Sequence, residues 1–152
     1  MSSNNRIDFN EPMSELINRL EVEHKEFELN LAEISTNVQK NNIVHATEIL
    51  RGISEKIIWH AVEEEARLMR VIMARAKEDS AESIKIMQEH NWVIKFFNNR
   101  LAMLEKLSAS PRTDEYVRVK DDLNEFVNNL RNHFREEEQI VFPLALKLER
   151  TK

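Results

Sequence analysis

Apolar residues recur every three or four positions along four long stretches of this chain, and this spacing constrains the fold more than any other feature. A helix completes a turn in about 3.6 residues, so the spacing lines up the apolar side chains along one buried helical face. The stretches run from Pro12 to about Val38, from about Ile43 to Lys77, from about Ala81 to Leu107, and from the end of a Pro111-containing loop to about Leu148. Their apolar stripes are Leu16, Leu20, Phe27, Leu31, Ile34 and Val38; Ile49, Ile53, Ile57, Leu68 and Val71; Ile86, Phe97, Leu101 and Leu104; and Leu123, Phe126, Leu130, Ile140, Leu144 and Leu148.

Short polar breaks separate the four stretches, at residues 39–42, around Asp79 and Ser80, and at residues 108–114. Four long helices with short connections predict an all-α, up-down-up-down four-helix bundle. Composition agrees, because one glycine and three prolines in 152 residues are too few for the turns of a β-fold. We therefore expect a flexible N-terminal arm over residues 1–11 and a single domain over residues 12–150.

Charge and composition exclude several classes of protein. The formal net charge of −5 argues against a nucleic-acid partner, which requires a basic surface. The absence of cysteine removes disulfides, thiolate metal sites and iron–sulfur clusters. No stretch approaches the roughly 20 apolar residues of a membrane span, and the N-terminus lacks the pattern of a signal peptide. We expect a cytoplasmic protein with no membrane partner; the sequence indicates no oligomeric state.

Each apolar stripe has a gap, and the gap contains polar residues. They are His24 in the first stripe, His60 and Glu64 in the second, His90 in the third, and His133 and Glu137 in the fourth. His24 and His60 lie 17 and 19 residues from Asn41 in the first break, a difference of roughly 3 Å along a helix. The mismatch across the second break is roughly 6 Å. We therefore predict that six polar residues converge on one layer of the bundle.

Two buried carboxylates in such a layer need compensating positive charge. An unpaired buried carboxylate costs several kcal/mol, and no lysine or arginine lies on a stripe at this level. Imidazole and carboxylate ligands suit iron, zinc or manganese, and two metal ions account for six protein ligands. Residues four apart on a helix point in similar directions, so each His-x-x-x-Glu pair can address one centre. The sequence thus favours a dinuclear metal site.

The two pairs lie within matching His-x-x-Glu-Glu-Glu runs, at residues 60–65 and 133–138. In each run the middle glutamate points toward the core. We expect the flanking residues, Glu63, Glu65, Glu136 and Glu138, to be solvated. Glu136 lies on the other flank of His133, so a supporting role behind the ligands is the alternative for that residue.

Four motifs resemble a known family. They are EHKEF around His24, HAVEEE from His60, EHNWVIKFF around His90 and HFREEEQIVFPL from His133. In order, spacing and helix placement they resemble the hemerythrin-like family, also called the HHE cation-binding domain, over nearly the whole chain. The resemblance implies a bundle that encloses a non-haem centre of two iron ions. It also implies that His24, His60, His90 and His133 are terminal ligands, and that Glu64 and Glu137 bridge the irons beside an oxo, hydroxo or water bridge.

Two positions depart from the oxygen-carrying members of that family. Ile94 stands where those members have a second histidine on the third helix. Their fourth helix provides an aspartate five residues after its histidine, whereas Glu137 follows His133 by four residues, although Glu138 occupies the fifth position. Fewer protein ligands leave more open coordination positions. The departures favour chemistry with oxygen, peroxide or nitric oxide, or iron sensing or storage, over simple reversible oxygen carriage.

Four functional readings follow from these observations. The leading hypothesis is a di-iron protein that binds or reduces a small oxidant, which includes a peroxide- or nitric-oxide-reactive oxidoreductase. The others are an iron sensor or store in which metal binding drives folding, a metal-free helical interaction module, and a site that holds zinc in place of iron. A ferritin-like centre needs two Glu-x-x-His pairs, and only Glu21 and His24 have that spacing.

Five further polar or aromatic residues are weaker candidates for the site. Glu28 repeats the four-residue spacing after His24 but lies at the edge of its stripe. His45 and Tyr116 lie 15 and 17 residues along the chain from His60 and His133, so we expect both to be remote from the centre. We expect Trp59 and Trp92 to pack beside the ligand histidines.

Overall fold

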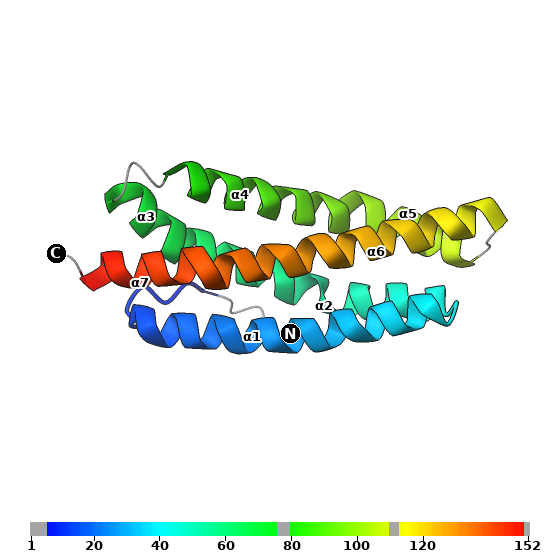
Figure 1. The fold of residues 1–152 in the computed structure, drawn as a ribbon, viewed down its shortest axis with the longest axis horizontal. Coiled ribbons are helices and arrows are strands. Elements are labelled where there is room, and N and C mark those ends of the chain that lie inside the picture. Colours follow the sequence, from blue (N-terminus) through cyan, green and yellow to red (C-terminus); the bar gives the residue numbers. More distant parts are fainter. Residues whose placement is uncertain (1–5, 76–79, 110–112, 151–152) are drawn as a thin grey trace.

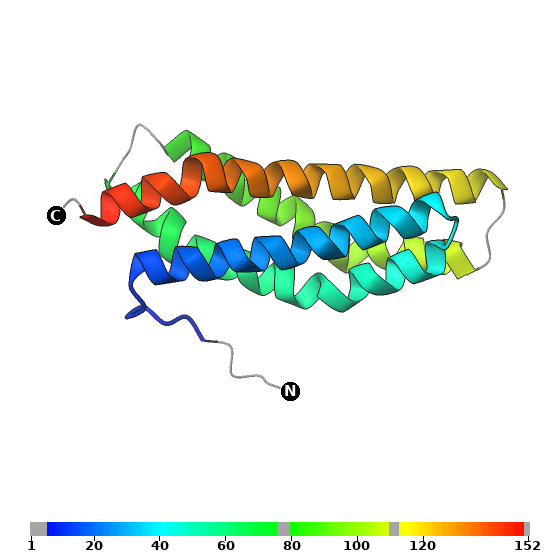
Figure 2. The ribbon, with the colours of Figure 1, turned by 60° about the horizontal axis from the view of Figure 1, so that its bottom comes forward.

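Four helical rods lie side by side along the long axis of the computed structural model, which describes residues 6–75, 80–109 and 113–150 (Figures 1 and 2). The first rod is α1 (Met13–Gln39), and the second joins α2 (Ile43–Glu63), η1 (Glu64–Met69) and α3 (Arg70–Arg75). The third joins α4 (Ser80–Lys95), η3 (Phe96–Arg100) and α5 (Leu101–Ala109), and the fourth joins α6 (Thr113–Glu136), η4 (Glu137–Val141) and α7 (Phe142–Arg150). The segments η1, η3 and η4 are π-helical turns. The described residues contain no strand, and the predicted all-α four-helix bundle is confirmed.

The first predicted break is observed, since α1 ends at Gln39 and α2 begins at Ile43. Asn41 adopts a left-handed conformation with φ of 63°, which asparagine tolerates better than most residues. The Tyr116 hydroxyl donates to the Asn41 carbonyl over 2.5 Å and ties this connection to α6. The other two predicted breaks fall partly on residues 76–79 and 110–112, which lie outside the described residues. The third break is shorter than predicted, because α5 continues to Ala109 and α6 begins at Thr113.

Two apolar clusters fill the bundle, and the polar layer separates them. On each rod, the apolar residues that flank the gap belong to different clusters: Phe27 and Leu20, Ile57 and Leu68, Val93 and Ile86, and Leu130 and Val141. The polar layer is therefore held between two closely packed apolar regions, and each rod contributes to both regions.

The fourth rod departs from the predicted stripe beyond the polar layer. We predicted that Ile140 faces the core, but its side chain is 46% exposed, whereas Val141 and Ala145 are buried. The π turn η4 accommodates one residue more than an α-helical turn, so it rotates the following residues around the rod. The second rod shows the same shift after η1, where Ile72 is fully buried and the predicted Val71 only partly.

The segment before α1 lies outside the bundle (Figure 2). Residues 1–5 of the predicted arm lie outside the described residues. The Arg67 guanidinium donates to the carbonyl oxygens of Asp8 and Glu11 over 2.7 Å each, which attaches this segment to η1. The domain limits at residues 12 and 150 stay predictions. None of the described helices combines the length and the apolar character needed to cross a bilayer.

Candidate metal centre

The polar residues of the four gaps lie together in the middle of the bundle. Every rod contributes: His24 from α1, His60 from α2, Glu64 from η1, His90 from α4, His133 from α6 and Glu137 from η4. All six side chains are buried, and Glu64 and Glu137 are 0% exposed. The structure thus brings together all six residues that the sequence singled out.

The six residues form two groups of four that share both carboxylates. One group contains His24, His60, Glu64 and Glu137, and the other contains Glu64, His90, His133 and Glu137. Within each group the ligand atoms all lie within 4.8 Å of one another. The Nε2 atoms of the histidines point inward, with His60 Nε2 3.0 Å from Glu64 Oε2 and His133 Nε2 3.1 Å from Glu137 Oε2. This arrangement suits two cations bridged by two carboxylates.

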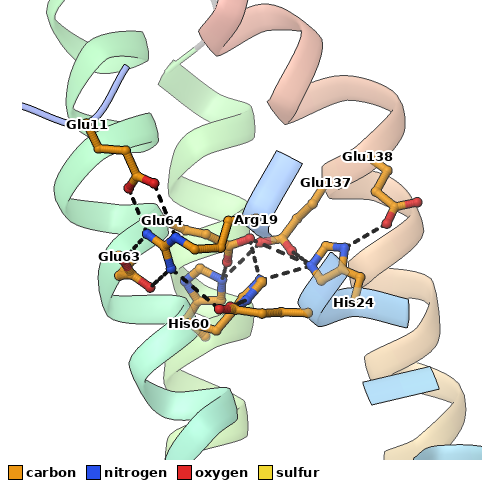
Figure 3. Close-up of polar contacts among 10 residues, drawn as sticks. Glu11, Arg19, His24, His60, Glu63, Glu64, Glu137 and Glu138 are labelled. Atoms are coloured by element: carbon orange, nitrogen blue, oxygen red, sulfur yellow. Dashed lines mark hydrogen bonds and ion pairs between the residues drawn. The ribbon is translucent and has the colours of Figure 1, made fainter. Parts of the chain in front are cut away.

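Each of the four histidines also contacts a second glutamate through its outward-facing Nδ1. The distances are 2.8 Å from His24 to Glu138, 2.7 Å from His60 to Glu23, 2.8 Å from His90 to Glu65, and 2.6 Å from His133 to Glu89. Figure 3 shows the contact of His24 with Glu138. Such contacts fix the orientation and tautomer of an imidazole, and they make the inward nitrogen a stronger electron donor.

These outer glutamates form a closed ring around the bundle. The first rod provides Glu23 to the second, the second provides Glu65 to the third, the third provides Glu89 to the fourth, and the fourth provides Glu138 to the first. Each outer glutamate therefore connects its own rod to the histidine of the next one. The ring ties the orientation of every histidine to the packing of two rods.

At the centre of the layer, hydrogen-bond acceptors outnumber the available donors. A carboxylate can only accept, so each Nδ1 that faces an outer glutamate carries a proton, and a neutral imidazole then has only a lone pair on Nε2. The Nε2 atoms of His24 and His60 lie 3.0 Å apart, so if both imidazoles are neutral their two lone pairs face each other and repel. Glu64 Oε1 and Glu137 Oε1 are buried without a well-aligned hydrogen bond, although they lie 3.1 Å from the Nε2 atoms of His90 and His24, respectively. A cation between these atoms removes both conflicts, so the donor set fits a bound metal.

Without metal, protons compensate for the buried charge. Burial alone lowers the pKa of an imidazole, but nearby carboxylates outweigh it, and Glu64 and Glu23 raise the pKa of His60 to about 10. In the same way, carboxylates raise the pKa of His90 to about 12 and that of His133 to about 9. Burial acts to raise the pKa of Glu137, but the surrounding histidines hold it well below its usual value. The carboxylates thus favour positive charge in the layer.

The expectation that the flanking glutamates of both runs are solvated holds for Glu138, which is 42% exposed, fails for the buried Glu63, and holds only in part for Glu65 and Glu136. Glu65 and Glu138 contact His90 and His24, as described above. Glu63 is 5% exposed and forms a bidentate ion pair with Arg19, at 2.9 and 2.6 Å. Glu136 is partly buried and pairs with Lys85 at 2.7 Å, so the described contacts give it no histidine to support.

The sequence analysis missed Glu23 and Glu89, although the chain contains a signal for both. Each precedes a gap histidine by one residue, while Glu65 and Glu138 follow a gap glutamate by one residue. Neighbouring residues on a helix differ by about 100° in direction, so such a glutamate lies at the edge of the buried face. From that edge it reaches the adjacent rod.

The weaker candidates lie outside the two groups of four ligand residues. Glu28 pairs with Arg131 at 3.2 Å, and His45 is exposed beside Glu48. Trp92 is 40% exposed and packs against the Phe126 ring, with 5.4 Å between the ring centroids.

A small cavity adjoins the layer on the side of the larger apolar cluster. Its volume of about 10 Å³ leaves room for one water-sized molecule. His60, Glu64, His90 and His133 form its polar wall, and Ile57, Ala61, Val93, Leu130 and Phe134 form its apolar wall. The arrangement can admit a molecule of very few atoms next to the inner nitrogens.

Comparison with protein families agrees with this geometry. The hemerythrin HHE cation-binding domain matches residues 15–145, which include all six residues of the layer and all four outer glutamates. No curated protein and no solved structure matches the chain. The buried histidine and glutamate groups fit a metal-binding site. With its matched motifs, its bundle and its polar layer, the chain belongs to the hemerythrin HHE cation-binding domain family.

Proposed function

We propose that this protein holds two non-haem iron ions and uses them to bind or reduce a small oxidant: oxygen, peroxide or nitric oxide. The observation that carries the proposal is the pair of four-residue groups that share Glu64 and Glu137. His24 and His60 hold one ion, His90 and His133 hold the other, and the two carboxylates bridge them. When bound, iron supplies open coordination positions and the electrons for reduction.

The surrounding residues favour a small ligand. The apolar wall of the cavity excludes bulk water and leaves space for only a few atoms. The outer glutamates keep the four imidazoles in one orientation, so the ligand atoms need little rearrangement when the metal or the oxidant binds. His24 and His133 are among the lining residues of two surface grooves, so the outer edge of the layer lies close to solvent on two sides.

Metal analysis of untagged protein purified without chelator tests the proposal. We expect about two iron ions per chain and visible absorption bands that azide or peroxide alters. Glu137→Gln should lower the iron content, because it removes a bridging charge, whereas Glu136→Gln, which changes the neighbouring pair with Lys85, should retain it. Zinc, or one metal ion per chain, would contradict the redox proposal. A chain that takes up no metal after anaerobic exposure to iron would contradict the ligand assignment.

A second function is favoured by the complete burial of Glu64 and Glu137. If the charge of the layer prevents stable folding without metal, iron binding drives folding and the protein acts as an iron sensor or store. Circular dichroism of metal-free protein distinguishes the two functions. A large loss of helix that added iron restores would favour the sensor, and an unchanged spectrum would favour the oxidant-binding protein.

A further inference from the structure

The four outer glutamates have different electrostatic surroundings. The side chain of Glu23 lies 3.4 Å from the guanidinium of Arg19, between Glu23 Oε2 and Arg19 Nη1. Within the part of the chain that the structure describes, Glu65, Glu89 and Glu138 form no ion pair with a lysine or arginine. Among the described residues, Glu23 is thus the outer glutamate with an arginine in direct contact, whereas the ammonium group of Lys85 acts on Glu89 only from a greater distance.

Arg19 is held firmly in this position. It forms two contacts with the nearly buried carboxylate of Glu63, at 2.9 and 2.6 Å, and two with Glu11, at 2.8 and 3.3 Å (Figure 3). Bidentate contacts of this kind fix the plane of a guanidinium group. Arg19 therefore presents a fixed positive charge to Glu23 rather than a mobile surface charge.

The charge acts on the centre through one hydrogen bond. Glu23 Oε1 lies 2.7 Å from His60 Nδ1, and His60 Nε2 points toward Glu64 inside the layer. An outer carboxylate that attracts the Nδ1 proton makes the inward nitrogen a better donor, and a cation beside that carboxylate reduces the attraction. The carboxylates of Glu63 and Glu11 contact the same guanidinium and offset its charge at longer range, so Arg19 acts on the centre through this hydrogen bond.

We propose that Arg19 is a positioning residue that makes the two metal positions unequal, so that the position held by His24 and His60 binds its cation more weakly than the one held by His90 and His133. This inference rests on the metal centre of the proposed function. It goes further by assigning the weaker position and the residue that weakens it. That position is the one from which a cation leaves first.

Zinc provides a test that needs no redox activity. We would load wild-type and variant proteins with zinc, follow the two binding steps by competition with a chelator, and record the Nδ1–H signals of the histidines by NMR. Glu23→Gln identifies the His60 signal. In Arg19→Gln we expect the zinc dissociation constant of the weaker step to fall by about fivefold, which is the upper range for the effect of a partly exposed charge. We also expect the His60 Nδ1–H signal to move downfield. The His133 signal should stay in place.

Three further variants separate charge from shape and from loss of folding. Arg19→Lys keeps the positive charge but loses the guanidinium group and its bidentate contacts. This variant should bind zinc as the wild type does. Arg19→Gln combined with Glu63→Gln avoids an unpaired buried carboxylate and should still move the His60 signal. Arg51→Gln removes an arginine from a comparable bidentate pair with Glu105, far from the layer, and should change neither readout.

The possible outcomes are distinct. Unchanged zinc steps and an unchanged His60 signal in both Arg19→Gln variants would overturn the inference and leave the metal centre intact. An equal effect of Arg19→Lys would show that shape rather than charge acts, which also overturns it. Fewer than two zinc ions per wild-type chain would overturn the proposed centre itself, and the inference with it.

Discussion

The cavity beside the polar layer makes a specific prediction for Leu130. This side chain is 1% exposed and forms part of the apolar wall. Leu130→Ala removes the end of the side chain next to an existing void, so neighbouring atoms cannot easily close the space. Large-to-small core changes cost about 2–5 kcal/mol, with the higher values where the cavity stays open. We expect a loss of about 3–5 kcal/mol in the free energy of unfolding.

Leu123→Ala provides a matched control for this change. Leu123 lies on the same helix and in the same apolar cluster, is 0% exposed, and does not line the cavity. Its truncation should also destabilise the protein, by about 2–5 kcal/mol. Urea unfolding of the two variants measures both losses, and the comparison separates the cost of lost packing from any effect on the centre.

The functional readout is the binding of azide to the iron-loaded protein. Azide is a rod of three atoms, which exceeds the space for one water-sized molecule. The larger cavity of Leu130→Ala should therefore let azide bind faster than in the wild type, whereas Leu123→Ala should bind it at the wild-type rate. Stopped-flow absorption measures these rates. Equal azide rates in the two variants would refute the role of the cavity as the ligand pocket.

Three further predictions concern proton release, the pH dependence of stability and the outer ring. Near neutral pH, zinc binding to the metal-free protein should release about three protons, from His60, His90 and His133, since their pKa values lie well above neutrality and a metal binds neutral imidazole. Calorimetry in buffers of different ionisation enthalpy counts them. Because folding raises these pKa values, the stability that they give to the metal-free protein is complete below about 6.5. It is lost progressively as pH rises through the folded pKa values, about 9 for His133, about 10 for His60 and about 12 for His90. A urea midpoint that does not fall as pH rises above 6.5 would contradict the assignment. Glu89→Gln should weaken zinc binding about 10–100-fold by releasing His133, while Glu48→Gln, beside the exposed His45, should not. Equal zinc affinities of these two variants would exclude a role for the ring.

The fold and the inner layer could be predicted because both depend on a local regularity. Helical spacing identifies the buried face of each rod, and a polar residue inside that pattern is costly enough to attract attention. His24 and His90 were identifiable as interruptions of a stripe, with no partner in their own helix. The level of each gap along its rod then placed the residues together, because short connections keep neighbouring rods in register.

The outer ring could not be predicted in this way, because it depends on which rods are neighbours. Glu65 and Glu138 belong to runs of three glutamates, which are usually solvated when taken alone. Their partners lie on other rods, 25 and 114 positions away in the chain. Only the arrangement of the four rods brings each edge glutamate within reach of the next histidine. Spacing within one helix can place such a glutamate at the edge of the buried face, but it does not say which histidine on another rod the glutamate contacts.

The error at Ile140 has a related cause, which lies in the polar layer itself. Both π turns at the layer begin at its carboxylates, η1 at Glu64 and η4 at Glu137. The wider turn rotates the chain just after each carboxylate, so an apolar stripe counted at a constant helical period is one residue too early beyond it. Val141 and Ile72 occupy the core positions that uninterrupted counting gave to their predecessors. In this family member, the residues proposed to bridge the metals thus stand where the helical phase changes, and the two apolar clusters need separately counted stripes.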